Sequence, residues 1–210
     1  EKNGHYLIIL SLKDADYVSD YIRGKGDRDD FLRKFAGAYS DGFDPDLHLI
    51  FVGVANQTTM LQSETEELQV RVRKAVIERD GSEEKYHVFD TICGATQERQ
   101  NALFQMLNTK DQSPMDLLLV VGGYNSSNTT HLAEIGEENL PTFFIRNAKC
   151  LESLESIIHY DLEHKAEIKS DYPGLMLKEQ PIVIGVTAGA SCPNNLIEST
   201  IIRSMELRGI

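Results

Sequence analysis

Apolar residues along this chain follow two patterns, which alternate from its beginning to its end. Short apolar runs bounded by turn residues are typical of buried strands, whereas apolar residues three or four positions apart are typical of amphipathic helices. The runs that predict strands are residues 6–11, 47–55, 86–92, 115–121, 142–145 and 181–187. The stretches that predict helices are residues 14–22, 31–38, 64–80, 97–108, 130–138 and 194–207.

Strands that alternate with helices predict a fold of the α/β class. These strands are apolar almost throughout, as in parallel sheets that are covered by helices on both faces. We expect two tandem small parallel-sheet units, residues 1–88 and residues 89–210. Asp14 is expected to cap the first helix, and Asp80-Gly81 is expected to end the third.

Composition and charge exclude several classes of protein. With 41% hydrophobic residues the chain is too apolar to be disordered. It contains no run of the roughly 20 apolar residues that a membrane-spanning helix needs. Its 21 basic and 33 acidic side chains give a net charge of −12, which argues against nucleic acid and against an anionic membrane as partners. The opening residues carry no secretory signal, and both ends of the sequence are typical of boundaries placed around a folded region.

The three cysteines do not form a disulfide framework. Cys93, Cys150 and Cys192 are an odd number without a Cys-x-x-Cys spacing, so we expect a reducing compartment. Cys93 lies between a predicted strand and a predicted helix, where a thiolate is stabilised as a nucleophile or metal ligand. The alternative for Cys93 is a buried small hydrophobic residue. Cys150 is interpreted as structural, and no ligand spacing supports Cys192.

Four loops that follow predicted strands carry the candidate chemistry. They are ANQTTM, TICGATQERQ, VVGGYNSSNT and GVTAGASCP, and in open α/β sheets ligands bind beyond the carboxyl ends of the strands. Hydroxyl, amide and backbone N–H donors at helix starts suit an anion, and these donors are neutral. The loops match neither the dinucleotide fingerprint nor the P-loop. Since Ser, Thr and Asn are also the preferred N-caps, helix capping alone remains an alternative.

In this order and spacing, the four motifs resemble those of 4-hydroxy-3-methylbut-2-enyl diphosphate reductase, with ANQTTM and TICGATQERQ closest to the plant and cyanobacterial branch. The resemblance covers residues 47 to 200. It implies an oxidoreductase of three similar α/β units whose [4Fe–4S] cluster is held by three cysteines. The implied reaction is reductive removal of the substrate's allylic hydroxyl, which gives isopentenyl and dimethylallyl diphosphate at the end of the methylerythritol phosphate route. The implied electron donor is ferredoxin or flavodoxin, and the implied location is the plastid stroma or the bacterial cytoplasm.

The resemblance also assigns roles to individual residues. Cys93 matches the last of the three cluster cysteines, and Thr58 matches a threonine near the hydroxyl end of the substrate. The positions that match diphosphate-binding residues are Ser126, Asn128 and Ser191, with Ser127 lying between the first two.

One departure from the family pattern limits these implications. The family's first two cluster cysteines, its pocket histidines and its proton-relaying glutamate belong to an amino-terminal region that has no counterpart in this sequence. We therefore expect the chain to represent the second and third of three units, inactive by itself and without an intact cluster. The alternative hypothesis is a cluster-free module that binds a diphosphate or another protein.

Overall fold

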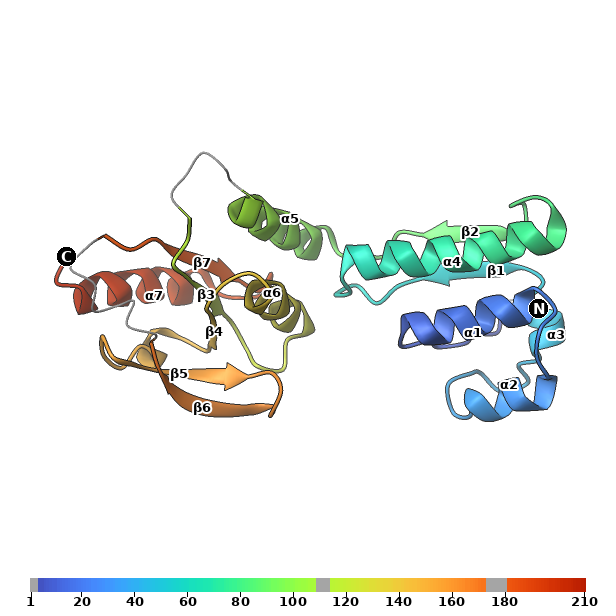
Figure 1. Ribbon diagram of the computed structural model, residues 1–210, viewed down its shortest axis with the longest axis horizontal. Helices are drawn as coiled ribbons and strands as arrows, with labels where there is room; N and C mark the ends of the chain where they lie inside the picture. The colour runs from blue at the N-terminus through green and yellow to red at the C-terminus, as the bar shows by residue number, and fades with distance from the viewer. Residues whose placement is uncertain (1–3, 109–113, 173–180) are drawn as a thin grey trace. The chain divides into compact units, whose positions relative to one another are not determined.

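The computed structural model describes residues 4–108, 114–172 and 181–210, and it divides the chain into two compact units. Unit 1 comprises Glu1–Gln57 and Leu61–Thr91, and unit 2 comprises Thr58–Met60 and Ile92–Ile210. Helices alternate with strands in both units, which confirms the α/β class (Figure 1). In the described part of the chain, none of the helices combines the length and the hydropathy that a membrane span requires.

Unit 1 contains a two-stranded parallel sheet. Strand β1 (Val52–Ala55) pairs with β2 (Tyr86–Phe89), and the helix α4 (Gln62–Asp80) connects them. The helix ends at Gly81, whose φ of 74° is the left-handed conformation that glycine adopts most easily, as the sequence predicts. Side chains of β1 alternate between half-buried and exposed, so this small sheet has one buried and one exposed face.

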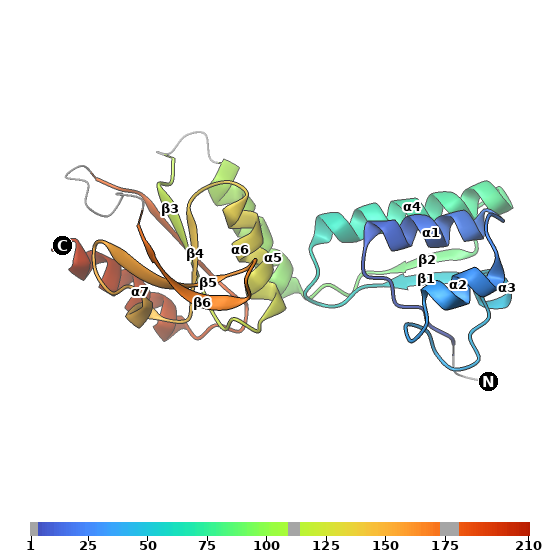
Figure 2. The same cartoon turned by 60° about the horizontal axis from the view of Figure 1, so that its bottom comes forward.

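Helix α1 (Leu12–Ile22) packs against α4, and the two run side by side in Figure 2. Its apolar face is buried as predicted. The N-cap, however, is Ser11 and not Asp14, because Ser11 keeps an extended backbone and its Oγ accepts the Asp14 N–H at 3.2 Å. The Asp14 carboxylate reaches back and accepts the Leu10 N–H at 3.3 Å. These hydrogen bonds place the N-cap three residues earlier than predicted.

The prediction of a strand over residues 6–11 is wrong, and the strand predicted over residues 47–55 is confirmed only at its end. Residues 6–11 make one isolated bridge, between Leu7 and Tyr39, in the described part of unit 1. The run 47–55 begins inside a short helix, α3 (Pro45–His48), and only its last four residues form β1. A proline at the first helical position favours this helix over an extended strand.

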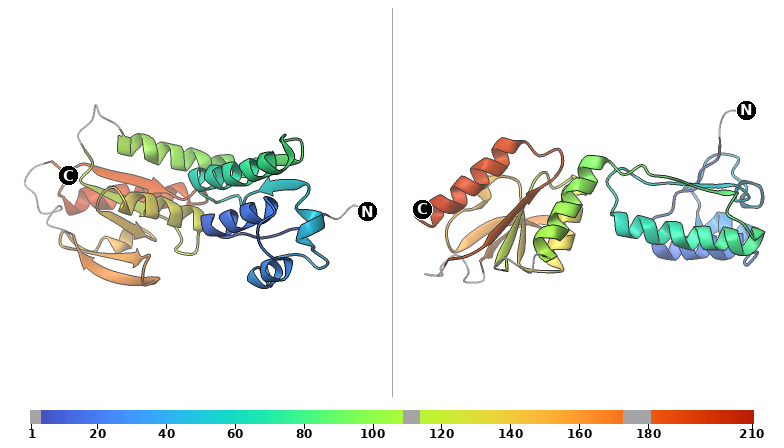
Figure 3. Two further views of the ribbon diagram at one scale, coloured as in Figure 1. Left: turned by 45° about the vertical axis from the view of Figure 1, so that its right-hand side comes forward. Right: turned by 90° about the horizontal axis from the view of Figure 1, so that it is seen from above.

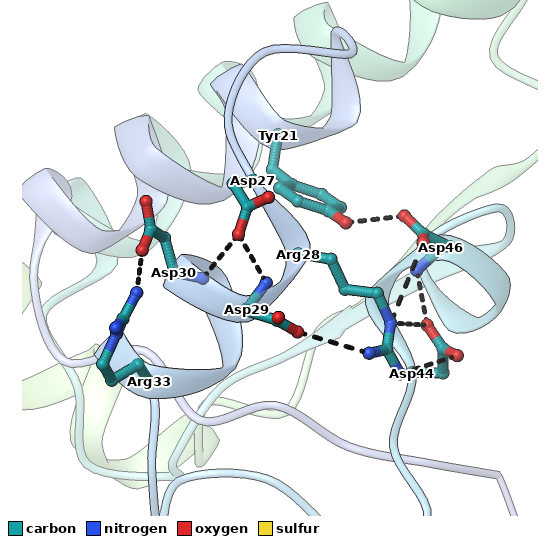
Figure 4. A network of polar contacts seen from close by, with 8 residues as sticks. All are labelled: Tyr21, Asp27, Arg28, Asp29, Asp30, Arg33, Asp44 and Asp46. Carbon is teal, nitrogen blue, oxygen red and sulfur yellow. Dashed lines mark hydrogen bonds and ion pairs between the residues drawn. The ribbon is translucent and has the colours of Figure 1, made fainter.

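A network of polar contacts joins α1 to the next two helices (Figure 4). Asp27 caps α2 (Arg28–Lys34) by accepting two N–H groups of its first turn, at 2.8 and 3.1 Å. Arg28 donates to the Asp44 carboxylate at 3.2 and 3.3 Å, and the Tyr21 hydroxyl donates to Asp46 at 2.6 Å. These side chains are exposed in large part, whereas Phe31 of α2 is fully buried in the unit 1 core, so the polar contacts supplement an apolar anchor.

Unit 2 contains a five-stranded sheet in the order β6-β5-β4-β3-β7. Its strands are β3 (Leu117–Val121), β4 (Thr142–Ile145), β5 (Ser156–Asp161), β6 (Ala166–Asp171) and β7 (Ile184–Ala188). Its helices are α5 (Gly94–Asn108), α6 (Ser127–Glu137), a short 3-10 turn η1 (Ala148–Cys150) and α7 (Asn194–Leu207). Strands β4 and β7 flank β3 in parallel, whereas β5 and β6 form an antiparallel hairpin at the edge, which the sequence analysis did not predict.

Helices cover both faces of this sheet (Figure 3). Leu117 and Leu119 of β3 pack in one cluster with Leu196 and Ile197 of α7. Leu118 faces the other way, towards α6, where a Cβ on Gly136 would lie 2.7 Å from its Cδ2 atom. All five residues of β3 are buried, which is why this strand reads as a continuous apolar run.

Candidate functional site

Three helices of unit 2 begin at the carboxyl edge of its sheet. Because β3, β4 and β7 are parallel, their carboxyl ends lie at one edge. Helices α6 and α7 begin at that edge, directly after β3 and β7, and α5 runs back along the sheet before β3 begins (Figure 1). Partial positive charge from the three helix starts therefore faces the same edge.

Ser126 acts as the N-cap of α6. Its Oγ accepts the Thr129 N–H at 3.4 Å and the Thr129 hydroxyl at 3.0 Å. The Ser126 N–H in turn donates to the Gly123 carbonyl at 3.0 Å, which closes the turn after β3. The Ser126 side chain thus caps the helix in this structure, which was the alternative interpretation of these loops.

The loops after β3 and β7 lie against each other. Gly189 donates its N–H to the Val121 carbonyl at 3.2 Å, at the end of β3. A Cβ on Gly189 would overlap the Thr129 hydroxyl and lie 3.8 Å from the Ser126 Oγ. A glycine is therefore required for this close approach, which brings the loop that carries Ser191 to the start of α6.

Asn128 is the most unusual polar residue of the site. Its side chain is 5% exposed, and within the described residues neither its amide nitrogen nor its amide oxygen has a hydrogen-bond partner. Leaving a buried amide unpaired costs about 1–3 kcal/mol, so this amide needs a partner such as water, an ion or a ligand. Ser127 and Ser191, by contrast, are exposed.

Thr58 and Cys93 are brought together at the start of α5. The Cys93 N–H donates to the Thr58 carbonyl at 3.0 Å, and the Cys93 carbonyl accepts the Gln97 N–H in the first turn of the helix. Both residues are exposed, so the interpretation of Cys93 as a buried hydrophobic residue is wrong. Next to Thr58, the Thr59 hydroxyl is buried and has no hydrogen-bond partner among the described residues.

The residues of this chain do not fit a cluster that needs three thiolates. Cys150 lies buried in the unit 2 core, and Cys192 is half-buried, with a thiol pKa that burial raises. All three cysteines belong to the described residues, among which no group of three His, Cys, Asp or Glu side chains is placed to hold a metal ion. His131, the histidine nearest the Ser126 loop in sequence, instead contacts Glu134 at 2.8 Å on the surface of α6.

Sequence reasoning missed several residues that shape the site. The sequence shows Thr129 and Gly189 only as members of two separate loops. The packing shows that the Thr129 side chain fills the space beside Gly189. In the sequence Tyr124 is one residue of a polar loop, but in the structure its ring contacts residues of β4 and of β5, a strand that was not predicted. The aromatic contacts were unpredictable because the hairpin that supplies one partner was not predicted.

Comparison with known proteins gives the family. A protein of Prochlorococcus marinus named 4-hydroxy-3-methylbut-2-enyl diphosphate reductase is 46% identical over 209 residues, which are 97% of this chain and 50% of that protein. A protein of the same name from Trichodesmium erythraeum is 46% identical over 200 residues, which are 93% and 48% of the two chains. A solved structure titled (E)-4-hydroxy-3-methyl-but-2-enyl diphosphate reductase overlaps 93% of this chain and 65% of that chain, with a TM-score of 0.42 and 22% identity.

These findings confirm the resemblance that the four motifs carry. The chain spans about half the length of the curated relatives it matches. The family model described as LytB protein matches residues 7–206, and the chain therefore belongs to the LytB protein family.

Proposed function

We propose that this chain contributes about half of a 4-hydroxy-3-methylbut-2-enyl diphosphate reductase and that its own task is to bind the diphosphate group of the substrate. The relatives that support this proposal bear the name of that reductase, and they are about twice as long as the chain. The complete enzyme would remove the allylic hydroxyl of the substrate reductively. Isopentenyl and dimethylallyl diphosphate would be its products.

The buried amide of Asn128 is the observation that carries the proposal. A diphosphate offers several strong acceptor oxygens, and one of them would satisfy the amide nitrogen of Asn128 once that side chain turns from its buried position at the start of α6 towards the ligand. The unsatisfied N–H groups of the first helical turn would add to this binding, as they do at other anion sites. Ser126, Ser127 and Ser191 would supply hydroxyl groups from the same edge, and Thr58 would lie at the hydroxyl end of the substrate.

Cys93 would be one ligand of the [4Fe–4S] cluster in the complete enzyme. Its exposure and its position before α5 suit a thiolate ligand. The remaining ligands would have to come from outside these 210 residues, since Cys150 lies in the core. Ferredoxin or flavodoxin would be the electron donor, in a plastid stroma or a bacterial cytoplasm.

The test is a calorimetric titration of the purified chain with isopentenyl diphosphate and with inorganic diphosphate. We expect saturable binding by the wild type and at least a tenfold loss of affinity in Asn128→Leu, because a tenfold loss corresponds to about 1.4 kcal/mol. The same substitution should raise thermal stability, since it replaces a buried amide by an apolar group of similar size. Opposite effects on binding and on stability would separate a ligand contact from a structural role.

Asn139→Leu is the matched control at the other end of the same helix. The Asn139 side chain donates to the Ile135 carbonyl at 2.7 Å, so its loss should lower stability and leave affinity within about twofold. An Asn128→Leu protein that binds diphosphate as well as the wild type would contradict the assigned site. Absence of saturable binding by the wild type would contradict the proposed function itself.

A second candidate is a cluster-free module that binds a diphosphate or another protein. It is favoured by one observation, that no three potential metal ligands come together in the described residues. The titration separates the two forms of this candidate, because a pure interaction protein should show no saturable diphosphate binding.

A further inference from the structure

Tyr124 anchors the loop between β3 and α6 to the strands beside it. Its ring stacks on Tyr160 of β5, with centroids 4.7 Å apart and planes 22° apart. It also meets the edge of Phe144 of β4 at 5.1 Å and 86°. Both arrangements lie in the range of separations and angles that aromatic pairs prefer.

Packing of the ring holds Tyr124 in place. Its hydroxyl oxygen is buried and makes no hydrogen bond of good geometry in the described part of the chain, although burial and the nearby Cys150 and Glu167 raise its pKa. The guanidinium of Arg146, which directly follows β4, lies 5.5 Å from the ring centroid, a distance at which a cation is attracted to an aromatic face. Glu167 of β6 pairs with Arg146 at 2.7 Å.

The β5–β6 hairpin supplies two residues around Tyr124: Tyr160, which stacks on its ring, and Glu167, which pairs with Arg146. Tyr160 and Glu167 are directly opposite each other in the register of the two strands, so their side chains project from the same face. One face of a polar edge hairpin thus contacts the ring of Tyr124 and fixes the cation beside it. Tyr124 itself lies outside β3 and α6, so its ring is positioned by these contacts and by Phe144.

The segment between Tyr124 and the candidate site is short. Gly122 is held by its N–H, which donates to the Ile145 carbonyl at 3.0 Å, and Ser126 is held by the turn to Gly123. Asn128 follows Tyr124 by four residues. The position of the Tyr124 ring therefore restrains the backbone that presents Asn128 and the first turn of α6.

We propose that the β5–β6 hairpin orders the diphosphate-binding loop through Tyr124, so that Tyr124 and Tyr160 are positioning residues for the ligand. The inference rests on the proposed function, because it assumes that the ordered loop binds a diphosphate. It assigns the hairpin a part in ligand binding although neither of its strands pairs with β3 or β7.

The first test needs no ligand. Amide hydrogen exchange of the full 210-residue chain should be faster at Thr129 and Thr130 in Tyr124→Ala and in Tyr160→Ala, while Leu119 in the central strand stays protected.

Tyr124→Phe keeps the ring and should exchange like the wild type, because the hydroxyl contributes no hydrogen bond of good geometry among the described residues. Ile168→Ala is the matched control, since Ile168 lies on the opposite face of the same hairpin. Unchanged exchange at Thr129 and Thr130 in both alanine variants would overturn the inference.

The second test is the affinity for inorganic diphosphate, measured by calorimetry on the same proteins. Tyr124→Ala and Tyr160→Ala should bind about five- to tenfold more weakly, because the loop must then be ordered when the ligand binds. Tyr124→Phe and Ile168→Ala should stay within about twofold of the wild type. Wild-type affinity in Tyr124→Ala would overturn the inference, as would an equal loss in Ile168→Ala. A wild type that does not bind would overturn the proposed function, and hydrogen exchange would still decide whether the hairpin orders the loop.

Discussion

Gly189 and Thr129 show how individual residues shape the candidate site. Thr129 is 1% exposed and β-branched, so its side chain has little freedom to move aside. Gly189 leaves the space into which the Thr129 hydroxyl projects. The sequence marks both residues as members of loops, but a contact between loops that lie sixty residues apart in the chain cannot be read from local spacing.

Gly189→Ala should therefore destabilise the protein. The added Cβ would overlap the Thr129 hydroxyl and lie 3.3 Å from the Thr129 Cβ, and overpacking of this kind typically costs about 1–3 kcal/mol. The free energy of unfolding in urea measures the loss. Gly94→Ala is the control, because no described atom lies within 4 Å of the Cβ that it would add. If the overlap is the cause, Thr129→Ala should recover part of the loss in the double variant, and a purely additive result would exclude it.

At the scale of elements, the sequence predicts best where periodicity is long and burial is one-sided. Helix α7 begins and ends at the predicted residues, and α4 ends at the predicted glycine. The edge hairpin β5–β6 escaped prediction because its strands are mostly half-buried or exposed, so they carry no apolar run. The apolar run 6–11 predicts a strand that does not form, because an apolar segment makes a strand only when a partner strand is available.

The same limit applies to the candidate site. The residue types and loop positions of Ser126, Asn128 and Cys93 could be read from the sequence, because strand ends and helix starts can be located locally. The burial of Asn128 and the separation of Cys150 from Cys93 depend on tertiary packing, which no local pattern encodes.

The start of α1 gives a prediction about pH. The Lys34 ammonium donates to the Asp14 carboxylate at 2.8 Å, and this contact, supported by Ser11 and the Leu10 N–H, holds the pKa of Asp14 below its ordinary value. A carboxyl group whose pKa is lower in the folded state stabilises the protein above its unfolded pKa of about 3.9, and that stabilisation is lost as the pH falls towards the folded value. Asp14→Asn should therefore be less stable than the wild type at pH 7, and the difference should shrink below about pH 4.

Chemical denaturation of both proteins between pH 3 and pH 7 checks this prediction. Ser126→Ala, which removes the N-cap of α6, is the useful comparison, because the Ser126 hydroxyl bonds to Thr129 and not to a carboxylate. We expect it to cost about 1 kcal/mol in the upper part of this pH range. A difference between Asp14→Asn and the wild type that is constant over the whole range would show that the carboxylate charge does not contribute.

At the scale of the whole molecule, a net charge of −12 does not oppose the proposed ligand. Overall charge acts at long range and is screened over about 10 Å at moderate salt. The proposed site uses an amide, hydroxyl groups and helix starts, whose interactions with an anion act at contact distance. Diphosphate binding by this chain should thus depend less on salt than binding by a cluster of lysines and arginines.

The number and placement of the cysteines determine what the chain can hold by itself. A cluster bound by three thiolates needs three cysteines close together, whereas here Cys150 is 5% exposed in a core and Cys93 is exposed at a helix start. Anaerobic reconstitution of the 210-residue chain should leave iron far below the content of one [4Fe–4S] cluster, without the visible absorption of such a cluster. A protein with a known [4Fe–4S] cluster, treated identically, is the positive control. Cys93→Ser should leave the small iron content of the chain unchanged, because one thiolate binds iron only weakly. Stoichiometric iron with a cluster spectrum in the wild-type chain, lost in Cys93→Ser, would contradict this prediction and would require the cysteines to come together in solution.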